Sequence, residues 1–338
     1  MKAIVIEGKR KLALVERDTP KADGQNVLMK IERVGICGSD IHFWENGDDK
    51  DKGLIMGHEF SGVVVDPGSR TDLKAGDRVT ALPMNNCQEC FYCKNGQFNR
   101  CTNVFAASPG ISAPGAYAEY FLARADVVRK LPDNVSLEEA AMLEPAAVSL
   151  RAVLEAGVKP GDSVLVSGGG IIGLLAAAWA KYAGATYIAM TEANPLRGEN
   201  AVTLGDVNEY FDARDEQLIP KLLKASGGGF DVCIDCAGLA ASINTGIFAL
   251  KKGGVLAQVG QNYTPQPVNI LIMTIKEIKF LGMFAYVHEF DRALNILAKG
   301  GINLKRFISG TVGLDGVQEA FERLSSGKYP DVKILIQP

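Results

Sequence analysis

The segment Ser163–Gly173 reads SVLVSGGGIIG, a short apolar run followed at once by a glycine-rich turn. The turn fits the pattern G-x-G-x-x-G through Gly168, Gly170 and Gly173, and an apolar helix is expected to start directly after it. In such a strand–turn–helix unit the glycines allow a tight turn, close approach of a pyrophosphate and close helix–strand packing. The free N–H groups at the start of the helix bind phosphate. The segment therefore predicts a Rossmann domain that binds a dinucleotide.

An acidic residue about 20 residues further on, Glu192, indicates which dinucleotide to expect. A carboxylate at the end of the second strand accepts hydrogen bonds from the adenosine ribose and repels a 2′-phosphate. The sequence therefore favours NAD over NADP. Arg197 could instead bind a 2′-phosphate, but beside Glu192 it is interpreted as lying on or near the adenine.

From Ser163 to about Ala285, apolar runs alternate with segments of helical period. Near-continuous apolar strands between helices indicate a parallel sheet that is covered on both faces, which is a doubly wound α/β fold. The predicted strands are 164–167, 187–191, 232–235 and 255–259, and the predicted helices are 171–183, 196–204, 218–224 and 242–250.

The two ends of the chain have a different pattern. Before about Ser136, turn residues separate short apolar runs, and no helical period of any length is visible, so we expect a β-rich domain. The runs lie at 3–6, 27–34, 61–65, 78–81 and 118–121. After residue 285 the pattern predicts helices 290–299 and 317–324 and a strand 333–336.

Composition limits the class of protein. A chain of 338 residues accommodates roughly two domains. With 47% hydrophobic residues, 22% charged residues and a net charge of −3, it offers no basis for binding nucleic acid or a membrane. The N-terminal segment does not resemble a signal peptide. Seven cysteines with metal-like clustering indicate a reducing, cytoplasmic setting. Cys233 and Cys236 form a C-x2-C in a predicted buried strand and are interpreted as packing residues.

Four of the cysteines, Cys87, Cys90, Cys93 and Cys101, have the spacing C-x2-C-x2-C-x7-C. Four thiolates in one short loop suit a tetrahedral zinc and leave no position for water or substrate. The alternative, a cluster of free or redox-active thiols, would be prone to oxidation. The spacing therefore predicts a structural zinc site on a loop.

A second, mixed set of ligands surrounds this loop in the sequence. Cys37, His58, Glu59 and Glu144 offer sulfur, nitrogen and oxygen donors. A single histidine is more often structural than a ligand. Together, however, the four residues form a set that is incomplete as a structural site and leaves a zinc ion with an exchangeable position. Either Glu59 or a water molecule could complete the ligand shell.

The chain resembles the zinc-dependent medium-chain dehydrogenases/reductases, most closely the polyol, sorbitol dehydrogenase-like branch. The resemblance covers essentially the whole chain and rests on several specific stretches. These are GICGSDIHFWENG (35–47), GHEFSGVV (57–64), GDRV (76–79), the four-cysteine loop, GAYAE (115–119), Glu144-Pro145 and the glycine turn. It implies a GroES-like catalytic domain formed by residues 1–146 and 287–338, with a Rossmann domain, residues 147–286, inserted between them.

The resemblance also implies roles for single residues. Cys37, His58 and Glu144 resemble catalytic zinc ligands, Glu59 a fourth, exchangeable ligand, and Asp40 the acid that orients His58. Ser39 corresponds to the residue that hydrogen-bonds the substrate hydroxyl, and His42 to the outer end of a proton relay. The predicted cofactor site consists of Gly168, Gly170, Ile172, Gly173, Glu192, Arg197, Val259, Gly260 and Phe284.

The implied activity is reversible hydride transfer between NAD and a polyol or secondary alcohol, with two zinc ions per chain. The implied partners are a small alcohol or ketone and further copies of the chain, as a homodimer or homotetramer. Two departures affect the substrate: Ala285 replaces an arginine of the polyol branch, and Phe43 replaces a tyrosine. A threonine- or 2,3-butanediol-type substrate, or a phosphorylated polyol, therefore remains an alternative. A non-catalytic nucleotide- or metal-binding protein of the same fold is the alternative from another class.

Overall fold

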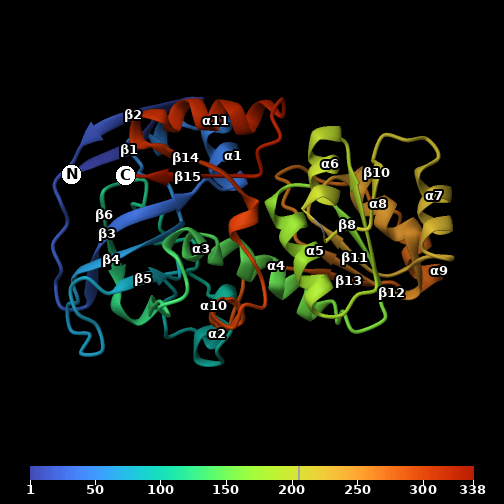
Figure 1. The fold of residues 1–338 in the computed structure, drawn as a ribbon, viewed down its shortest axis with the longest axis horizontal. Coiled ribbons are helices and arrows are strands. Elements are labelled where there is room, and N and C mark those ends of the chain that lie inside the picture. The colour runs from blue at the N-terminus through green and yellow to red at the C-terminus, as the bar shows by residue number, and fades with distance from the viewer. Residues whose placement is uncertain (205) are drawn as a thin grey trace. The chain divides into compact units, whose positions relative to one another are not determined.

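A computed structural model describes residues 1–204 and 206–338, which form two compact units (Figure 1). Unit 1 consists of Met1–Glu144 and Phe290–Pro338, and unit 2 of Pro145–Glu289. Each unit has its own main sheet. The sequence-based domain limits, 1–146 with 287–338 and 147–286, stay predictions.

Unit 2 is built on a six-stranded parallel sheet in the order β10-β9-β8-β11-β12-β13. The chain starts at β8 in the middle of the sheet, winds to one edge and then to the other, which is the Rossmann strand order. The strands are β8 (Ser163–Ser167), β9 (Tyr187–Glu192), β10 (Glu209–Asp212), β11 (Phe230–Asp235), β12 (Leu250–Gln258) and β13 (Lys279–Gly282). The predicted fold class is confirmed.

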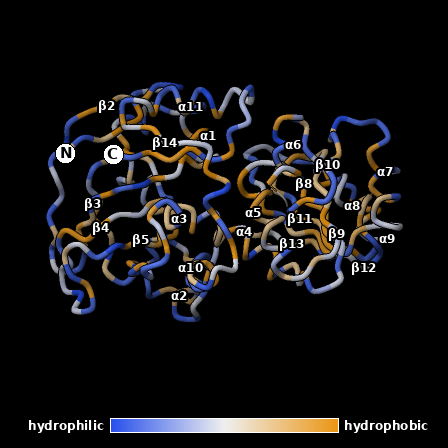
Figure 2. Tube along the Cα trace, in the orientation of Figure 1, coloured by the Kyte–Doolittle hydropathy of each residue, from blue (hydrophilic) through white to orange (hydrophobic). Residues whose placement is uncertain are grey.

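Helices flank this sheet on both faces, and the hydrophobic residues gather along its central strands (Figures 1 and 2). The buried residues of β8, β9, β11 and β12 pack against α7 and α8 in one continuous core. The helices are α4 (Leu143–Glu155), α5 (Ile171–Tyr182), α6 (Pro195–Thr203), α7 (Leu218–Ala225), α8 (Ala240–Ala249) and α9 (Ile270–Lys276).

Unit 1 is built on a mostly antiparallel sheet in the order β14-β15-β3-β4-β5-β7, with β6 paired to β3 and a separate hairpin β1-β2. The last strand, β15, pairs with β3, so the C-terminal segment completes the sheet that the N-terminal segment begins (Figure 1). The strands are β1 (Lys2–Gly8), β2 (Lys11–Glu16), β3 (Asn26–Gly35), β4 (Glu59–Asp66), β5 (Arg78–Ala81), β6 (Tyr120–Arg124), β7 (Val128–Lys130), β14 (Ile308–Gly313) and β15 (Lys333–Gln337).

Short helices connect the strands of unit 1. Trp44 from α1 and Phe321 from α11 are fully buried in its core, with ring centroids 5.6 Å apart. The helices are α1 (Gly38–Asn46), α2 (Phe91–Lys94), α3 (Leu137–Ala141), α10 (Glu289–Ala298) and α11 (Val317–Ser326), and the 3-10 turns are η1 (Asp49–Asp51), η2 (Phe98–Arg100), η3 (Ala125–Val127), η4 (Lys305–Phe307) and η5 (Leu314–Gly316).

The sequence shows no helical period before Ser136, yet the structure has two helices there, α1 and α2. The large apolar side chains of α1, Ile41, Phe43 and Trp44, fall within four residues, which is too short a stretch to show a helical period, and their packing against the core of unit 1 stabilises the helix. The four residues of α2 are too few to show a period. The strand predicted at 118–121 lies at Tyr120–Arg124, where it pairs with β3.

Within the part of the chain that the structure describes, no helix has the length and apolar content that crossing a membrane requires.

Candidate active site and zinc centres

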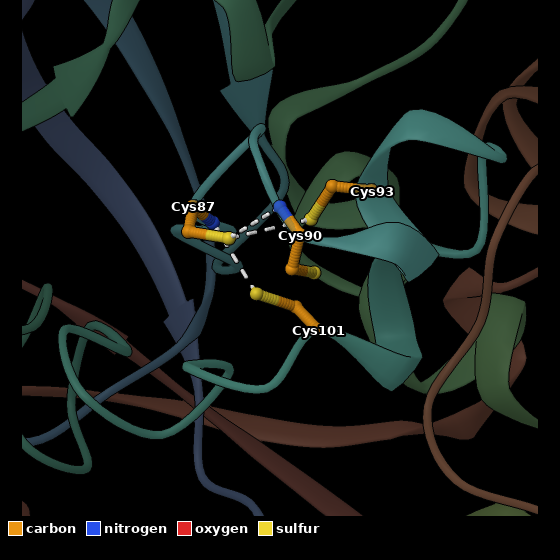
Figure 3. Close-up of side chains that lie close together, drawn as sticks. All are labelled: Cys87, Cys90, Cys93 and Cys101. Atoms are coloured by element: carbon orange, nitrogen blue, oxygen red, sulfur yellow. Dashed lines mark hydrogen bonds between the residues drawn. The ribbon is translucent and has the colours of Figure 1, made fainter.

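The four predicted zinc-binding cysteines meet in one loop of unit 1, which we call the zinc lobe, Cys87–Cys101 (Figure 3). Their four Sγ atoms lie within 4.8 Å of one another, and none forms a disulfide. Cys90 caps the start of α2, and Cys101 directly follows η2, so two short turns direct the sulfur atoms inward. Four converging thiols match the donors and geometry that a structural zinc requires.

Backbone N–H groups approach the sulfur atoms of the lobe. Cys87 N donates to Cys101 Sγ at 3.3 Å, and Cys90 N donates to Cys87 Sγ at 3.4 Å. Hydrogen bonds from the backbone lower the pKa of the Cys90 thiol to about 6, whereas burial raises the pKa of Cys93 to about 11. Zinc binds cysteine as the thiolate. Cys90 is therefore readily deprotonated for metal binding, whereas Cys93 must lose a proton when the metal binds.

Two residues that the sequence did not single out support the lobe from outside. Asn86 Nδ2 donates to Cys93 Sγ at 3.6 Å. Arg124 donates to the backbone O of Asn86 at 2.8 Å and to its Oδ1 at 2.6 Å. The guanidinium thus fixes the amide with its NH2 group toward the sulfur. Neither residue belongs to a recognisable motif, so no sequence signal could have found the pair.

The second centre brings together Cys37, His58 and Glu59, whose ligand atoms lie within 4.8 Å of one another. Cys37 caps the start of α1 after β3, and Glu59 is the first residue of β4. In the antiparallel pair β3–β4, Gly35 lies opposite Glu59. A Cβ at residue 35 would lie 2.2 Å from Glu59 Oε2, so only glycine leaves room for this carboxylate.

Lys333 is the counter-ion of Glu59 and was missed by the sequence analysis. Its Nζ lies 2.6 Å from Glu59 Oε2 and donates to the backbone O of Ile36 at 2.8 Å, and both side chains are fully buried. Burial would lower the pKa of Lys333, but the attraction of Glu59 raises it. The lysine therefore stays charged and donates a hydrogen bond to one carboxylate oxygen of Glu59. The same ammonium group also fixes the backbone of Ile36, the residue before Cys37.

Two buried polar atoms at this centre lack a hydrogen-bond partner among the described residues: Glu59 Oε1 and His58 Nδ1. His58 Nδ1 lies 3.5 Å from Asp40 Oδ1, close enough for electrostatic attraction but without hydrogen-bond geometry. Burial would lower the pKa of His58, but Asp40 and Cys37 raise it well above its usual value. A thiol, an imidazole and an unpartnered carboxylate oxygen are the donors that zinc prefers, so these residues fit a zinc ion.

Glu144, the fourth predicted ligand, does not belong to the group of three. It lies half-buried in the first turn of α4, and burial raises its pKa to about 7, while His58 lowers and Glu59 raises it. Its electrostatic interaction with both residues indicates proximity to the centre. Three of the four predicted ligands are thus brought together directly, and the role of Glu144 stays a prediction.

The predicted relay residues, Ser39 and His42, both lie on α1. Three residues apart on a helix, they share one face. Ser39 is half-buried and His42 is exposed, so this face leads from the metal centre toward solvent.

The glycine turn in unit 2 has the predicted backbone geometry. Gly168 follows β8 with a φ of +102°, a conformation that favours glycine. A Cβ at Gly173 would lie 1.8 Å from the backbone O of Gly168, so helix α5 can pack this closely only with glycine there. Gly170 caps α5, and Ile172 lies in the first turn of that helix.

The remaining predicted cofactor residues lie at the carboxyl ends of other strands in the same sheet. Glu192 ends β9, and its carboxylate accepts hydrogen bonds from Gly169 N at 2.7 Å and Asn194 N at 2.8 Å. Val259 and Gly260 follow β12, Phe284 follows β13, and Arg197 lies half-buried in α6. In open parallel sheets, ligands bind at this end of the strands.

Two buried residues of unit 2 near this edge were also missed. Arg151 Nη1 donates to the backbone O of Phe284 at 3.1 Å. Asp235 ends β11; its backbone O accepts hydrogen bonds from Val259 N and Gly260 N, both at 2.8 Å. Burial raises the pKa of Asp235. Both residues fix the loops that carry predicted cofactor residues.

Comparison with known proteins relates these features to one group of enzymes. Residues 23–133 match the family model described as alcohol dehydrogenase GroES-like domain, and residues 172–299 match the model described as zinc-binding dehydrogenase. The chain is 33% identical to sorbitol dehydrogenase of Bacillus subtilis (strain 168), a match that covers 100% of this chain and 97% of the relative.

Solved structures agree over the whole length. The chain is similar to 2R,3R-butanediol dehydrogenase from Bacillus subtilis, with a TM-score of 0.90 and 28% identity, covering 100% of this chain and 99% of that one. It is similar to the same degree to a zinc-binding dehydrogenase from Sinorhizobium meliloti 1021 bound to NADP, with a TM-score of 0.90, 28% identity and coverage of 100% and 99%.

Proposed function

This chain belongs to the family of zinc-dependent alcohol dehydrogenases and is an oxidoreductase acting on CH–OH groups, and we propose that it transfers hydride between NAD and a polyol or related secondary alcohol. Oxidation converts the alcohol to a ketone, and the reaction is reversible.

The observation that carries the proposal is the buried group of Cys37, His58 and Glu59, in which Glu59 Oε1 has no hydrogen-bond partner among the described residues. We assign this group, together with Glu144, to a catalytic zinc. A zinc ion held there would act as a Lewis acid on the substrate oxygen. The zinc lobe is assigned to a second, structural zinc, which gives two zinc ions per chain.

The face of α1 that carries Ser39 and His42 is assigned to the proton relay. The Oγ of Ser39 would take up the proton of the substrate hydroxyl while it gives its own proton onward, and the exposed imidazole of His42 would release a proton to solvent. A relay is needed because Asp40, which lies between these two residues on the helix, is buried and occupied by its own hydrogen bonds.

We assign the carboxyl edge of the unit 2 sheet to the dinucleotide, with NAD preferred over NADP. The Glu192 carboxylate is fixed by two backbone N–H groups beside the glycine turn, which suits hydrogen bonds to ribose hydroxyls and repels a 2′-phosphate. The similar structure from Sinorhizobium meliloti is bound to NADP, so the preference rests on Glu192 itself. Arg197 is assigned to the adenine end.

A polyol is the preferred substrate class because the similar protein from Bacillus subtilis is named sorbitol dehydrogenase. The second candidate is a vicinal diol. It is favoured by the similarity to 2R,3R-butanediol dehydrogenase and by Ala285 and Phe43, which remove two polar side chains found in the polyol branch.

We further propose a cytoplasmic homodimer or homotetramer. The edge strand β13 presents the half-exposed Phe280, and Ile270, Leu271 and Ile275 on α9 are 57–67% exposed. An exposed apolar surface beside an unpaired edge strand suits association with a second copy. Seven cysteines without a disulfide suit a reducing compartment.

The function is tested with His58→Ala and a panel of substrates. We expect the wild-type chain to carry two zinc ions and to form NADH from a polyol or diol. The variant should carry one zinc ion and lose at least about a thousandfold in kcat/KM, since it loses several kcal/mol of Lewis-acid stabilisation. Zinc is counted by atomic emission and turnover by NADH absorbance.

The matched control is His288→Ala, which removes an exposed histidine outside the assigned site and should keep both zinc ions and full turnover. The proposal fails if His58→Ala turns over at the normal rate, or if no polyol, diol or hydroxy amino acid yields NADH. Comparison of NAD with NADP on the best substrate tests the assignment of Glu192.

A further inference from the structure

Tyr117, which no part of the proposed mechanism uses, touches the segments on both sides of the Cys37–His58–Glu59 centre. The side chain is fully buried. Its hydroxyl lies 2.6 Å from Asp40 Oδ2. Its ring lies against Gly57, the residue before His58, because a Cβ at Gly57 would be only 2.5 Å from Tyr117 Cδ1. One side chain thus contacts the partner of His58 and the backbone that carries it.

Asp40 is the junction of this network. It is 2% exposed, so its charge must be compensated by neighbouring donors. Its Oδ2 accepts hydrogen bonds from the Tyr117 hydroxyl and from Cys37 N at 3.0 Å, and its Oδ1 lies 3.5 Å from His58 Nδ1. The positions of Cys37 and His58 in the assigned zinc site therefore depend on the position of the Asp40 carboxylate.

The direction of the short hydrogen bond follows from what each group can donate. Asp40 Oδ2 already accepts a hydrogen bond from Cys37 N, so this carboxylate acts as an acceptor. Burial, and then the Asp40 charge, raise the pKa of Tyr117 well above its usual value. The phenol is thus the donor and the carboxylate the acceptor, and 2.6 Å is the length expected for such a charge-assisted bond.

The backbone of Tyr117 is fixed as firmly as its side chain. Its N–H donates to Met56 O at 2.9 Å, and its O accepts from Ile4 N at 2.8 Å. Its ring meets Phe321 edge-on, with centroids 6.1 Å apart. The hydroxyl therefore reaches Asp40 from a rigid position, as support for a precise metal geometry requires.

We propose that Tyr117 is a positioning residue of the metal centre: its hydroxyl fixes Asp40, and Asp40 in turn fixes Cys37 through the backbone and His58 through Nδ1. This inference rests on the proposed catalytic zinc at Cys37 and His58. Loss of a partner that contacts the ligands directly, as Asp40 does, changes metal affinity by about 10–100-fold, and Tyr117, one hydrogen bond further out, is expected at the lower end of this range.

The test uses the zinc-loaded full chain with Tyr117→Phe, which removes the hydroxyl and keeps the ring against Gly57. We expect zinc at the catalytic centre to bind about tenfold more weakly in competition with a chromophoric chelator. Zinc in the lobe is the internal reference and should be unchanged. After exchange of the catalytic zinc for Co²⁺, the visible spectrum should shift, because the ligand geometry changes while the ligands do not.

The control is Tyr187→Phe in unit 2, whose hydroxyl also donates to a carboxylate, Glu209, at 2.9 Å. It should leave zinc affinity and the Co²⁺ spectrum unchanged. In an Asp40→Ala background, Tyr117→Phe should weaken zinc binding by less than about twofold, because the hydroxyl acts through Asp40.

Three outcomes overturn the inference: wild-type zinc affinity and Co²⁺ spectrum in Tyr117→Phe, an equal loss in Tyr187→Phe, or an undiminished tenfold loss in the Asp40→Ala background. The last would show that the variant acts through packing. Failure of the proposed function is distinguishable, because then the wild-type chain itself would show no zinc that His58→Ala removes.

Discussion

The zinc lobe and the Cys37–His58–Glu59 centre both belong to unit 1, yet they are built in opposite ways. All four thiols of the lobe come from one short loop, and the nearest donors to them are backbone N–H groups of that loop and of Asn103 just after it. The second centre draws its groups from the end of β3, the start of β4 and, through Lys333, from β15. One is local in sequence, and the other exists only once the sheet has formed.

This difference indicates what each metal does for the protein. The lobe contains only a four-residue helix and a 3-10 turn, so metal ligation is the main force that can order it. The second centre lies on a sheet with an extensive core, and buried ion pairs fix its side chains. We therefore expect the lobe zinc to supply stability and the other zinc to supply chemistry.

The largest expected effect comes from Cys93→Ser, which removes one ligand of the lobe. Zinc content should fall from two ions to one, and the free energy of unfolding of unit 1 should fall by more than about 4 kcal/mol, because loss of a structural metal is among the most destabilising changes. The molecules that remain folded should keep most of their kcat. Metal analysis, urea unfolding and activity at low temperature measure the three quantities.

Cys236→Ser is the matched control, since Cys236 lies outside both centres and should change none of the three. If Cys93→Ser abolished kcat and left the free energy of unfolding unchanged, the lobe would have a catalytic role, and the contrast between the two metal sites would not hold.

The next largest effect is expected from Lys333→Met, which leaves the buried Glu59 without its counter-ion. Breaking a buried pair in this way costs about 3–5 kcal/mol. Lys251→Met, which breaks a surface pair with Asp231 at 2.7 Å, should cost about 1 kcal/mol or less. Urea unfolding of the wild-type chain and of the two variants measures these losses in the free energy of unfolding.

The double variant Lys333→Met with Glu59→Gln separates charge from packing. It should regain most of the lost stability because no buried charge is left unpaired. If Lys333→Met costs no more than Lys251→Met, the pair does not organise the second centre, and the contrast with the lobe loses its main support.

The same contrast explains which parts of the site the sequence could predict. The spacing of Cys87, Cys90, Cys93 and Cys101 is a local signal, so the convergence of these four thiols could be predicted, while the zinc ion itself stays a prediction. Cys37, His58 and Glu59 were identified through short motifs around them, and the structure brings them together. Lys333 lies hundreds of residues from Glu59 along the chain, in a strand that reads as apolar, and only the pairing of β15 with β3 connects them.

The fold shows the same distinction between local signals, which the sequence carries, and contacts between distant segments, which it does not. In unit 2 the strand–helix alternation repeats locally, and the predicted elements lie within a few residues of the observed ones. In unit 1, α1 was missed because it is held by contacts with distant segments: Trp44 packs into the core, and Asp40 accepts a hydrogen bond from Tyr117. Tertiary contacts position both Trp44 and Asp40, so the local sequence does not predict that α1 is a helix.

The smallest effect, and the finest test of the contrast, is expected from Asn86→Ala. The lobe has little support beyond its own loop, but Asn86 Nδ2 donates to Cys93 Sγ while Arg124 holds the amide in place. Sulfur is a weak acceptor, so zinc affinity of the lobe should fall by only about tenfold, the lower end for such partners. Asn85→Ala, whose side chain donates instead to Ala107 O at 2.8 Å, should leave the affinity unchanged. Chelator competition on the zinc-loaded chain measures both. A loss of a hundredfold or more in Asn86→Ala would mean that the lobe also depends on the surrounding fold, and the division between a local and a fold-built metal site would not hold.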